Sequence, residues 1–353
     1  MKVCILGPVQ TKSYYGGVAL FDEELGIGFA KNNCDVIIAT NQKDAIDRQL
    51  SEKVCIKKVS KASFRSYLKT EKPNIIIASL GYAALLPKRS MGYIAVYFLH
   101  GFFNESYYGK CKSMVASLYQ KHLIHRVNYV FANSYFTSMV NHEFFGILTD
   151  KVFHLAVSES VFQQSKGSTA KDKRANSILF AGRLVSAKGT RLIIEAAKML
   201  LDRGIEYELT IAGDGPDKNW MEEQARIFNL PMHFPGRVSQ TEIAKLYRES
   251  EVFVSLNPSE PFGITYLEAL LNNCKIVCPY TGGQVEFLQS MPERVEFVSG
   301  SEANAVTEAI TSLLNRKGVQ LIPDTIREKY EYSFVAERML DYLAQHSSSK
   351  ITL

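Results

Sequence analysis

The stretch Glu260-Pro-Phe-Gly-Ile-Thr-Tyr-Leu-Glu268 lies where the periodicity of the sequence changes. The apolar run 252–255 before it is typical of a buried strand, and the pattern after Gly263 is typical of a helix. We therefore expect Glu260 in a loop and Glu268 about one turn inside the helix. Because the first N–H groups of a helix attract anions, a phosphate could bind at Gly263. A carboxylate on either side could accept hydrogen bonds from vicinal sugar hydroxyls.

Short β-branched runs alternate with helical patterns along the whole chain. Several of these runs, such as Ile75-Ile76-Ile77, are continuously apolar, which indicates strands buried on both faces of a parallel sheet. Such alternation predicts right-handed βαβ units in two doubly wound sheets. The expected strands are 2–6, 35–40, 54–59, 74–79, 93–99, 128–132, 151–155, 177–181, 208–212, 252–255, 275–278 and 295–298.

A polar segment divides the chain into two parts. Residues 163–176 are rich in lysine and almost devoid of large apolar side chains, which is typical of a linker. We predict an N-terminal domain over residues 1–165 and a C-terminal domain over residues 166–330. The remaining residues 331–353 should form a helix and tail that pack back towards the N-terminal domain.

The composition excludes several classes of protein. Hydrophobic residues at 46% and charged residues at 22% argue against disorder and fibrous repeats. The longest apolar stretch, 75–86, is shorter than the roughly 20 residues that a bilayer requires, and no signal-peptide pattern is visible. We therefore expect a cytoplasmic protein. The six cysteines form no C-x-x-C pair, and no cysteine or carboxylate lies at ligand spacing beside His122 and His125, so we expect no metal and no other cofactor.

Positive charge is concentrated in the front half. Residues 1–165 carry 19 Lys+Arg against 12 Asp+Glu, a net +7, whereas the remainder carries 22 against 24, a net −2. The segment 110–126 is both basic and amphipathic. An anionic membrane surface could bind there, although a solvated lysine-rich surface is the alternative. We expect no nucleic-acid partner.

Further glycine-rich or charged loops follow the expected strands. Arg183 and Lys188 could neutralise a diphosphate without magnesium, because each supplies a positive charge near a helix start. The glycine pairs Gly16-Gly17 and Gly282-Gly283 would let the backbone approach a ligand closely. His100 follows a strand at its carboxyl end, the edge at which open α/β sheets bind ligands.

In this order the loops resemble glycosyltransferase family 4, the retaining enzymes of the GT-B fold. The family pattern G-R…K-G, G-x-G-P, E-G-F-G-x-x-x-x-E and G-G is matched by Gly182-Arg183, Lys188-Gly189, 213–216, 260–268 and Gly282-Gly283. The resemblance implies two Rossmann-like domains facing a central cleft. It also implies transfer of a sugar from a nucleotide diphosphate sugar, UDP-linked first and GDP-linked next, to a glycan or lipid-linked acceptor in cell-surface polysaccharide synthesis.

The resemblance implies a role for each loop. Arg183 and Lys188 would bind the donor diphosphate and stabilise the departing phosphate. Glu260 would hold hydroxyls of the donor sugar, Glu268 would bind the ribose, and His100 would lie near the reacting sugar. The expected catalytic residues are thus His100, Arg183, Lys188 and Glu260. The expected donor-binding residues are Gly16, Gly17, Gly182, Gly213, Arg237, Val238, Phe262, Gly263, Ile264, Thr265 and Glu268.

The sequence departs from the family in two places. Pro261 replaces the usual glycine after the first glutamate, and the family's Asn-Gly-Val-Asp stretch has no match at 154–158. The Asp-x-Asp motif that holds a metal in the other large glycosyltransferase fold is absent, which fits a metal-independent site. For the retaining step the resemblance implies same-face displacement, in which the donor phosphate helps to deprotonate the acceptor hydroxyl.

Other functions remain open at the level of the sequence. A nucleotide-sugar epimerase can share the two-domain architecture, and a non-catalytic protein could bind a nucleotide sugar without turning it over. A glycoside hydrolase also uses paired carboxylates, but it would not require Arg183 and Lys188. A dehydrogenase is disfavoured because the G-x-G-x-x-G fingerprint is missing.

Overall fold

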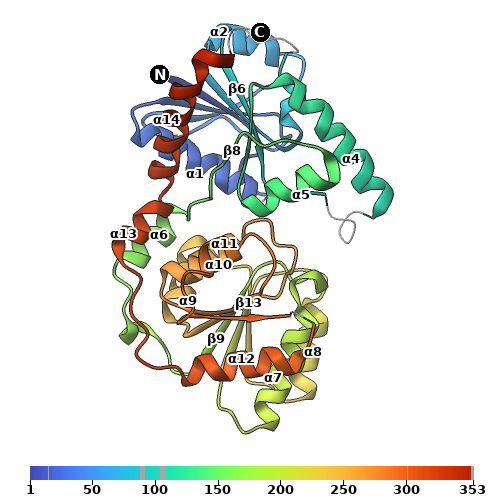
Figure 1. Ribbon diagram of the computed structural model, residues 1–353, viewed down its shortest axis with the longest axis vertical. Helices are drawn as coiled ribbons and strands as arrows, with labels where there is room; N and C mark the ends of the chain where they lie inside the picture. The colour runs from blue at the N-terminus through green and yellow to red at the C-terminus, as the bar shows by residue number, and fades with distance from the viewer. Residues whose placement is uncertain (15, 88–91, 104–108, 300, 351–353) are drawn as a thin grey trace. The chain divides into compact units, whose positions relative to one another are not determined.

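The computed structural model describes residues 1–14, 16–87, 92–103, 109–299 and 301–350. Over this part the chain forms two units (Figure 1). The first contains Met1–Ser158 and the residues from Lys329 onward, and the second contains Glu159–Glu328. Each unit has its own β-sheet, which is packed between helices.

The sheet of the first unit has the strand order β3-β4-β2-β1-β5-β6-β7-β8, and all neighbours are parallel except β3 with β4. In the first strand, Val3 and Ile5 enter one apolar core while Cys4 and Leu6 enter another, because successive side chains point to opposite faces of a sheet. Burial of both faces explains the continuously apolar strands. The strands are β1 (Lys2–Leu6), β2 (Asp35–Thr40), β3 (Arg48–Ser51), β4 (Val54–Lys58), β5 (Ile75–Ser79), β6 (Ile94–Leu99), β7 (Tyr129–Ala132) and β8 (Lys151–Val152).

The helices of the first unit are α1 (Gly17–Lys31), α2 (Phe64–Glu71), η1 (Leu80–Leu85), α4 (Lys110–Leu123), η2 (Ile124–Arg126), α5 (Tyr135–Phe145) and α14 (Tyr332–Lys350). Helix α14 packs along α1, although the two lie near opposite ends of the sequence (Figure 1). Asn32 Nδ2 donates a hydrogen bond to the carbonyl oxygen of Ser333 at 2.8 Å. A Cβ on Gly28 would lie 2.4 Å from the carbonyl oxygen of Tyr332, so only glycine permits this approach.

The sheet of the second unit is parallel throughout, in the order β11-β10-β9-β12-β13-β14. Its strands are β9 (Ser177–Ala181), β10 (Glu208–Ala212), β11 (Met232–Gly236), β12 (Val252–Val254), β13 (Lys275–Pro279) and β14 (Val295–Val298). Its helices are α6 (Glu159–Lys166), η3 (Ala170–Asp172), η4 (Ser186–Lys188), α7 (Thr190–Asp202), α8 (Lys218–Ile227), α9 (Gln240–Glu249), α10 (Ile264–Leu271), α11 (Val285–Leu288), α12 (Ala303–Asn315) and α13 (Asp324–Arg327), with η5 (Glu328–Tyr330) at the return to the first unit. Figure 1 shows α7, α8 and α12 on one face of the sheet and α9, α10 and α11 on the other.

The predicted fold class is confirmed, since both units are doubly wound and their central strands match the expected ranges. The expected strands lack β3 and β11, which lie at sheet edges: Arg48–Ser51 is short, mostly polar and antiparallel, and Met232–Gly236 ends in proline and glycine. The sequence gives no continuous apolar run by which such edge strands could be recognised.

The predicted boundary after residue 165 is wrong. The chain passes into the second unit after Ser158, and α6 packs against α9 and α10 of that unit. The polar segment 163–176 is not a free linker either: Lys173 Nζ donates to the carbonyl oxygens of Tyr247 and Asn272 at 2.9 Å and 2.7 Å. Its polar side chains thus serve as hydrogen-bond donors in folded structure, which composition alone does not reveal.

The close approach of α1 and α14 yields a first prediction. We expect Gly28→Val to lower the free energy of unfolding by about 2 kcal/mol or more, because the added side chain must displace the backbone at Tyr332. Thermal unfolding followed by circular dichroism measures the change. Gly17→Ala is the matched control, since a Cβ there would meet no atom within 4 Å. Equal melting temperatures for the two variants would contradict the packing argument.

Candidate functional site

The loops after β9, β10 and β11 pack against one another at the carboxyl edge of the second sheet. The N–H of Gly182 donates to the carbonyl oxygen of Ala212 at 3.0 Å, and that of Gly213 donates to Gly236 at 2.8 Å. A Cβ on Gly213 would lie 1.8 Å from the carbonyl oxygen of Gly182, so these backbones can approach only because glycine has no side chain. The predicted donor-binding residues Gly182 and Gly213 therefore bring two loops together.

Two of the predicted catalytic residues form an ion pair at this edge. Lys188 Nζ donates to Glu260 Oε2, and Asn257 Nδ2 donates to the same oxygen at 2.9 Å. The Lys188 and Glu260 side chains are 20% and 14% exposed, so the pair is largely shielded from water. Arg183 follows β9 on the same edge, with an exposed side chain. The structure thus places two cations and one carboxylate at the carboxyl ends of β9 and β12.

Helix α10 begins directly after the Glu260 loop. Gly263 is its N-cap residue, in the left-handed region with φ 89°. The N–H groups of Ile264 and Thr265 have no acceptor within the helix, because the first turn of a helix supplies none. This helix start could therefore bind an anion. Phe262 is buried against Phe287, with ring centroids 5.2 Å apart, so its side chain supports the loop from beneath.

The loop after β13 holds the Glu260 loop in place. The N–H of Gly283 donates to the carbonyl oxygen of Glu260 at 2.8 Å, and Thr281 Oγ1 donates to that of Pro258 at 2.9 Å. A Cβ on Gly283 would lie 2.1 Å from the carbonyl oxygen of Pro261. We expected this glycine pair to approach a ligand, but in the structure Gly283 approaches the neighbouring backbone.

Glu268 lies one turn inside α10, as the sequence predicts, and is 6% exposed. The hydroxyl of Tyr247 donates to its Oε2 at 2.9 Å. Burial raises the pKa of Glu268 to about 7, and the bond from Tyr247 only partly offsets this. The carboxyl group therefore titrates near neutrality, where it can either accept or donate a hydrogen bond.

Arg237 and Val238, two of the predicted donor-binding residues, follow β11 at the same edge. Arg237 is exposed, and its Nε lies 3.4 Å from Asp214 Oδ2 in the loop after β10. Val238 is half-buried.

The remaining predicted site residues belong to the first unit. Gly16 is the N-cap residue of α1, and Gly17 is the first residue of that helix. Both lie on the carboxyl side of β1, at the edge where β6 ends in His100.

His100 takes part in a buried polar chain that the sequence does not indicate. Its Nε2 lies 2.9 Å from Ser79 Oγ, which in turn donates to Asp22 Oδ1 at 2.7 Å. When Asp22 is ionised, Ser79 donates to it and accepts from His100 Nε2; when Asp22 is protonated, the two hydrogen bonds can run in the opposite direction. Burial lowers the pKa of His100 to about 3, so the ring is neutral. Burial also raises the pKa of Asp22 well above its usual range.

Metal-binding clusters and membrane-spanning helices are both absent from the described ranges. These residues contain no group of three or more His, Cys, Asp or Glu side chains that could hold a metal ion. Within the same part of the chain, no helix combines the length and the apolar character needed to cross a membrane.

The second unit matches a known family. Residues 161–330 match the family model described as glycosyl transferases group 1. The second unit is a group 1 glycosyltransferase domain. The matched residues include all the predicted site residues of the carboxyl edge, from Gly182 to Glu268.

Two curated relatives of this glycosyltransferase domain illustrate the likeness. An uncharacterized glycosyltransferase MJ1607 of Methanocaldococcus jannaschii is 27% identical over 171 residues, covering 46% of this chain and 43% of the relative. A 2-deoxystreptamine N-acetyl-D-glucosaminyltransferase of Niallia circulans is 26% identical over 140 residues, covering 39% and 36%. The chain thus spans less than half the length of these relatives.

Solved structures extend the likeness of fold to the whole chain. A sucrose-phosphate synthase from Thermosynechococcus elongatus matches with a TM-score of 0.77 at 15% identity, covering 99% of both chains. Anabaena Alr3699/HepE in complex with UDP and glucose matches with a TM-score of 0.68 at 16% identity, covering 100% of both. These matches confirm the predicted GT-B fold, with two Rossmann-like domains.

Several residues of the site were not found from the sequence. Asn257 lies in the same loop as Glu260, and its position after a strand could have marked it. Asp22, Ser79 and Tyr247 give no such signal, because a single polar residue in a helix or strand is typical of an exposed position.

The buried carboxyl group of Glu268 yields a second prediction. Because its folded-state pKa is raised to about 7, it contributes stability below its unfolded pKa of about 4.3, and this is lost as pH rises through about 7. Glu268→Gln cannot ionise. Between about pH 5 and pH 8 we therefore expect the wild type to lose up to about 3 kcal/mol of stability relative to the variant.

Thermal unfolding at a series of pH values tests this expectation. Glu302→Gln, which changes an exposed carboxylate of the same unit, is the control and should follow the wild type. Parallel curves for wild type and Glu268→Gln would show that Glu268 ionises normally.

Proposed function

We propose that the chain transfers a sugar from a nucleotide diphosphate sugar to a hydroxyl of a glycan or lipid-linked acceptor, without a metal ion. The observation that carries this proposal is the ion pair of Lys188 and Glu260 beside Arg183 and the start of α10. The arrangement offers cations for a diphosphate and a carboxylate for sugar hydroxyls within a group 1 glycosyltransferase domain.

The diphosphate would bind between Arg183 and the start of α10. Arg183 has no partner among the described residues, and its exposed guanidinium can turn to grip phosphate oxygens. Lys188 adds a second positive charge, and the α10 N-terminus adds its dipole. Together they would stabilise the charge on the departing phosphate. UDP is our first choice of nucleotide and GDP our second; the Anabaena relative in fold has been determined with UDP and glucose.

The donor sugar would bind through Glu260. Both hydrogen bonds to this carboxylate use Oε2, so Oε1 keeps its capacity to accept a sugar hydroxyl. Glu268 would bind the ribose hydroxyls. That His100, Gly16 and Gly17 contact the donor from the N-terminal unit stays a prediction.

We infer that the reaction proceeds with retention through same-face displacement. In this proposal Glu260 holds hydroxyls of the donor sugar and Glu268 holds those of the ribose, so neither carboxylate is assigned as a nucleophile. The donor phosphate would take the proton of the acceptor hydroxyl on the face from which it departs.

The phosphate site yields a third prediction. Without added metal, we expect UDP at 100 times its dissociation constant to stabilise the protein by about 2.7 kcal/mol. Loss of one charged hydrogen bond typically costs about 1.5–3 kcal/mol, so Arg183→Ala and Lys188→Ala should each raise the Kd for UDP at least tenfold. Isothermal titration calorimetry measures the Kd, with GDP and ADP for comparison.

Arg226→Ala is the matched control, because Arg226 is an exposed arginine of the same unit that pairs only with Glu223. Equal affinities in the wild type and both site variants would refute the phosphate site. Donor turnover that does not depend on an added acceptor would instead favour an epimerase.

The acceptor would be presented at an anionic membrane surface on the cytoplasmic side. Helix α4 exposes Met114, Val115, Leu118 and Tyr119, spacings that share one face of a helix. Helix α5 packs beside α4 and adds exposed apolar side chains, among them Phe144. Residues 110–142 contain four Lys or Arg and no Asp or Glu. Glu143 of α5 is an exposed carboxylate beside Phe144, so the surface carries a net positive charge, which complements the headgroups of an anionic bilayer.

Liposome flotation tests this surface as a fourth prediction. We expect the wild type to float with vesicles of anionic phospholipid and to remain behind with neutral vesicles. Val115→Asp combined with Leu118→Asp should abolish flotation, because it places negative charge in the apolar face. Ile227→Asp, at an exposed apolar position of the second unit, is the control and should leave flotation unchanged. No preference for anionic vesicles would exclude the membrane surface.

A further inference from the structure

A second charged region lies at the opposite edge of the second sheet. A cavity of about 300 Å³ opens at the amino ends of the strands. Glu251 directly precedes β12, Lys275 begins β13, and Arg294 directly precedes β14. Because all strands of this sheet are parallel, the cavity is separate from the carboxyl edge that holds Lys188 and Glu260.

The lining of this cavity is strongly basic. Its basic side chains are Lys173, Lys275, Arg294, Arg316 and Lys317, and Glu251 is the acidic residue in the lining. Glu251 accepts from Lys275 Nζ at 2.9 Å and from the Asn176 N–H at 2.8 Å, while Lys317 Nζ lies 3.7 Å away. The negative charge of Glu251 is therefore already balanced by these lysines. Arg316 is paired with Glu296 outside the lining.

The buried side chains of Lys173 and Lys275 contribute positive charge to the cavity, but their N–H groups already donate hydrogen bonds within the domain. Lys275 Nζ bonds to Glu251 and to the carbonyl oxygens of Leu313 and Arg316 at 2.5 Å and 2.8 Å, so it closes the C-terminus of α12. Lys173 Nζ is likewise bound to two carbonyl oxygens. Neither ammonium group needs a ligand.

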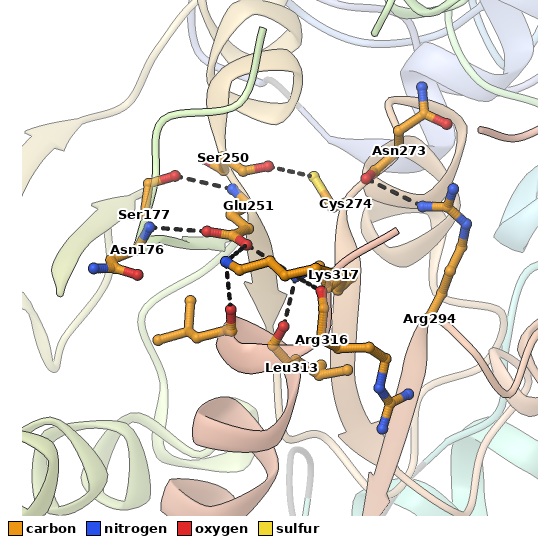
Figure 2. A network of polar contacts seen from close by, with 12 residues as sticks. Asn176, Ser177, Ser250, Glu251, Asn273, Cys274, Arg294, Leu313, Arg316 and Lys317 are labelled. Carbon is orange, nitrogen blue, oxygen red and sulfur yellow. Dashed lines mark hydrogen bonds and ion pairs between the residues drawn. The ribbon is translucent and has the colours of Figure 1, made fainter. Parts of the chain in front are cut away.

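Arg294 differs from these lysines. It is 1% exposed, and Nη1 donates to the carbonyl oxygen of Asn273 at 3.2 Å, the contact drawn in Figure 2. Its Nε and Nη2 have no hydrogen-bond partner among the described residues, and Glu293 Oε1 comes no closer than 4.0 Å to Nε. Arg327 repels it, and a buried Nη2 of Arg327 also has no partner in this part of the chain.

Arg327 is paired with Asp324 at 2.8 Å, whereas the nearest carboxylate to Arg294, that of Glu293, lies 4.0 Å from its Nε and leaves two buried donors of Arg294 unused. Buried charges in proteins are normally paired, and a buried donor without a partner commonly marks the place of an ion. Burial lowers the pKa of Arg294; Glu293 and Cys274 act in the opposite direction, and the charge of Arg327 adds to the lowering.

We propose that this cavity binds a small phosphate-bearing anion through Arg294, with Lys317 at its rim. A phosphate group offers several acceptor oxygens, which suit the planar fork of a guanidinium. The volume exceeds that of a single phosphate, so the ligand is either inorganic phosphate with water or a small phosphomonoester. Lys317 is 74% exposed and carries its charge on a flexible stem, so it can reach a bound anion. The inference does not depend on the proposed glycosyl transfer.

Equilibrium dialysis in a buffer free of phosphate and sulfate tests the proposal. Inorganic phosphate and glucose 6-phosphate are the probes, and Arg183→Ala removes phosphate binding at the carboxyl edge. We expect saturable binding that Arg183→Ala leaves within about twofold of the wild-type Kd, and that Arg294→Gln weakens at least tenfold. Tighter binding of glucose 6-phosphate would identify a phosphomonoester site, and tighter binding of inorganic phosphate a site for the free ion.

A second variant tests the proposal even if Arg294→Gln fails to fold. Lys317→Glu changes an exposed side chain at the rim, so it should fold normally and still weaken binding at least fivefold. Ile227→Asp, which adds negative charge to the same unit away from the cavity, should leave the Kd unchanged. The proposal is overturned if the wild type binds neither probe at millimolar concentration, if Arg183→Ala abolishes binding, or if Lys317→Glu binds like the wild type.

Discussion

The ion pair between Lys188 and Glu260 joins loops that are 72 residues apart in sequence, and the whole carboxyl edge of the second unit depends on it. The pair can form because β9 and β12 are neighbours in the sheet, so that their loops leave side by side. Asn257 completes the contact from the side, and the loop after β13 holds the backbone of Glu260. A carboxylate fixed in this way keeps one oxygen for a ligand and needs little reorganisation when the ligand binds.

The two edges of the second sheet use charge in different ways. At the carboxyl edge, Arg183 is exposed and Glu260 is balanced by Lys188, which suits a substrate that must enter and leave. At the amino edge, the positive charge of Arg294 is buried, two of its donors have no hydrogen-bond partner among the described residues, and the carboxylate of Glu293 lies 4.0 Å away. Each edge combines cations with a carboxylate, but Glu260 keeps one oxygen free of hydrogen bonds from the described residues, whereas both oxygens of Glu251 accept one.

Much of the fold could be predicted from local pattern. Central strands such as β1 and β5 are continuously apolar because they are buried on both faces, and that signal lies in the strand itself. Edge strand β3 was missed because it packs on few neighbours and needs no apolar run. The boundary after residue 165 was wrong for a related reason: the polarity of the segment 163–176 resembles that of a solvated linker, whereas Lys173 is bonded inside the second unit.

The sequence by itself determined the alternation of strands and helices and the glycine turns at strand ends. It also determined the order of the charged loops, which predicts Arg183, Lys188, Glu260 and Glu268 as site residues. The tertiary structure decided what each of these side chains contacts. That Glu260 bonds to Lys188, that Asp22 reaches His100 through Ser79, and that Arg294 has unused donors all depend on which strands are neighbours and how deeply each side chain is buried. Local periodicity does not encode these facts, because pairing between distant residues and loss of solvent arise only when the sheets assemble.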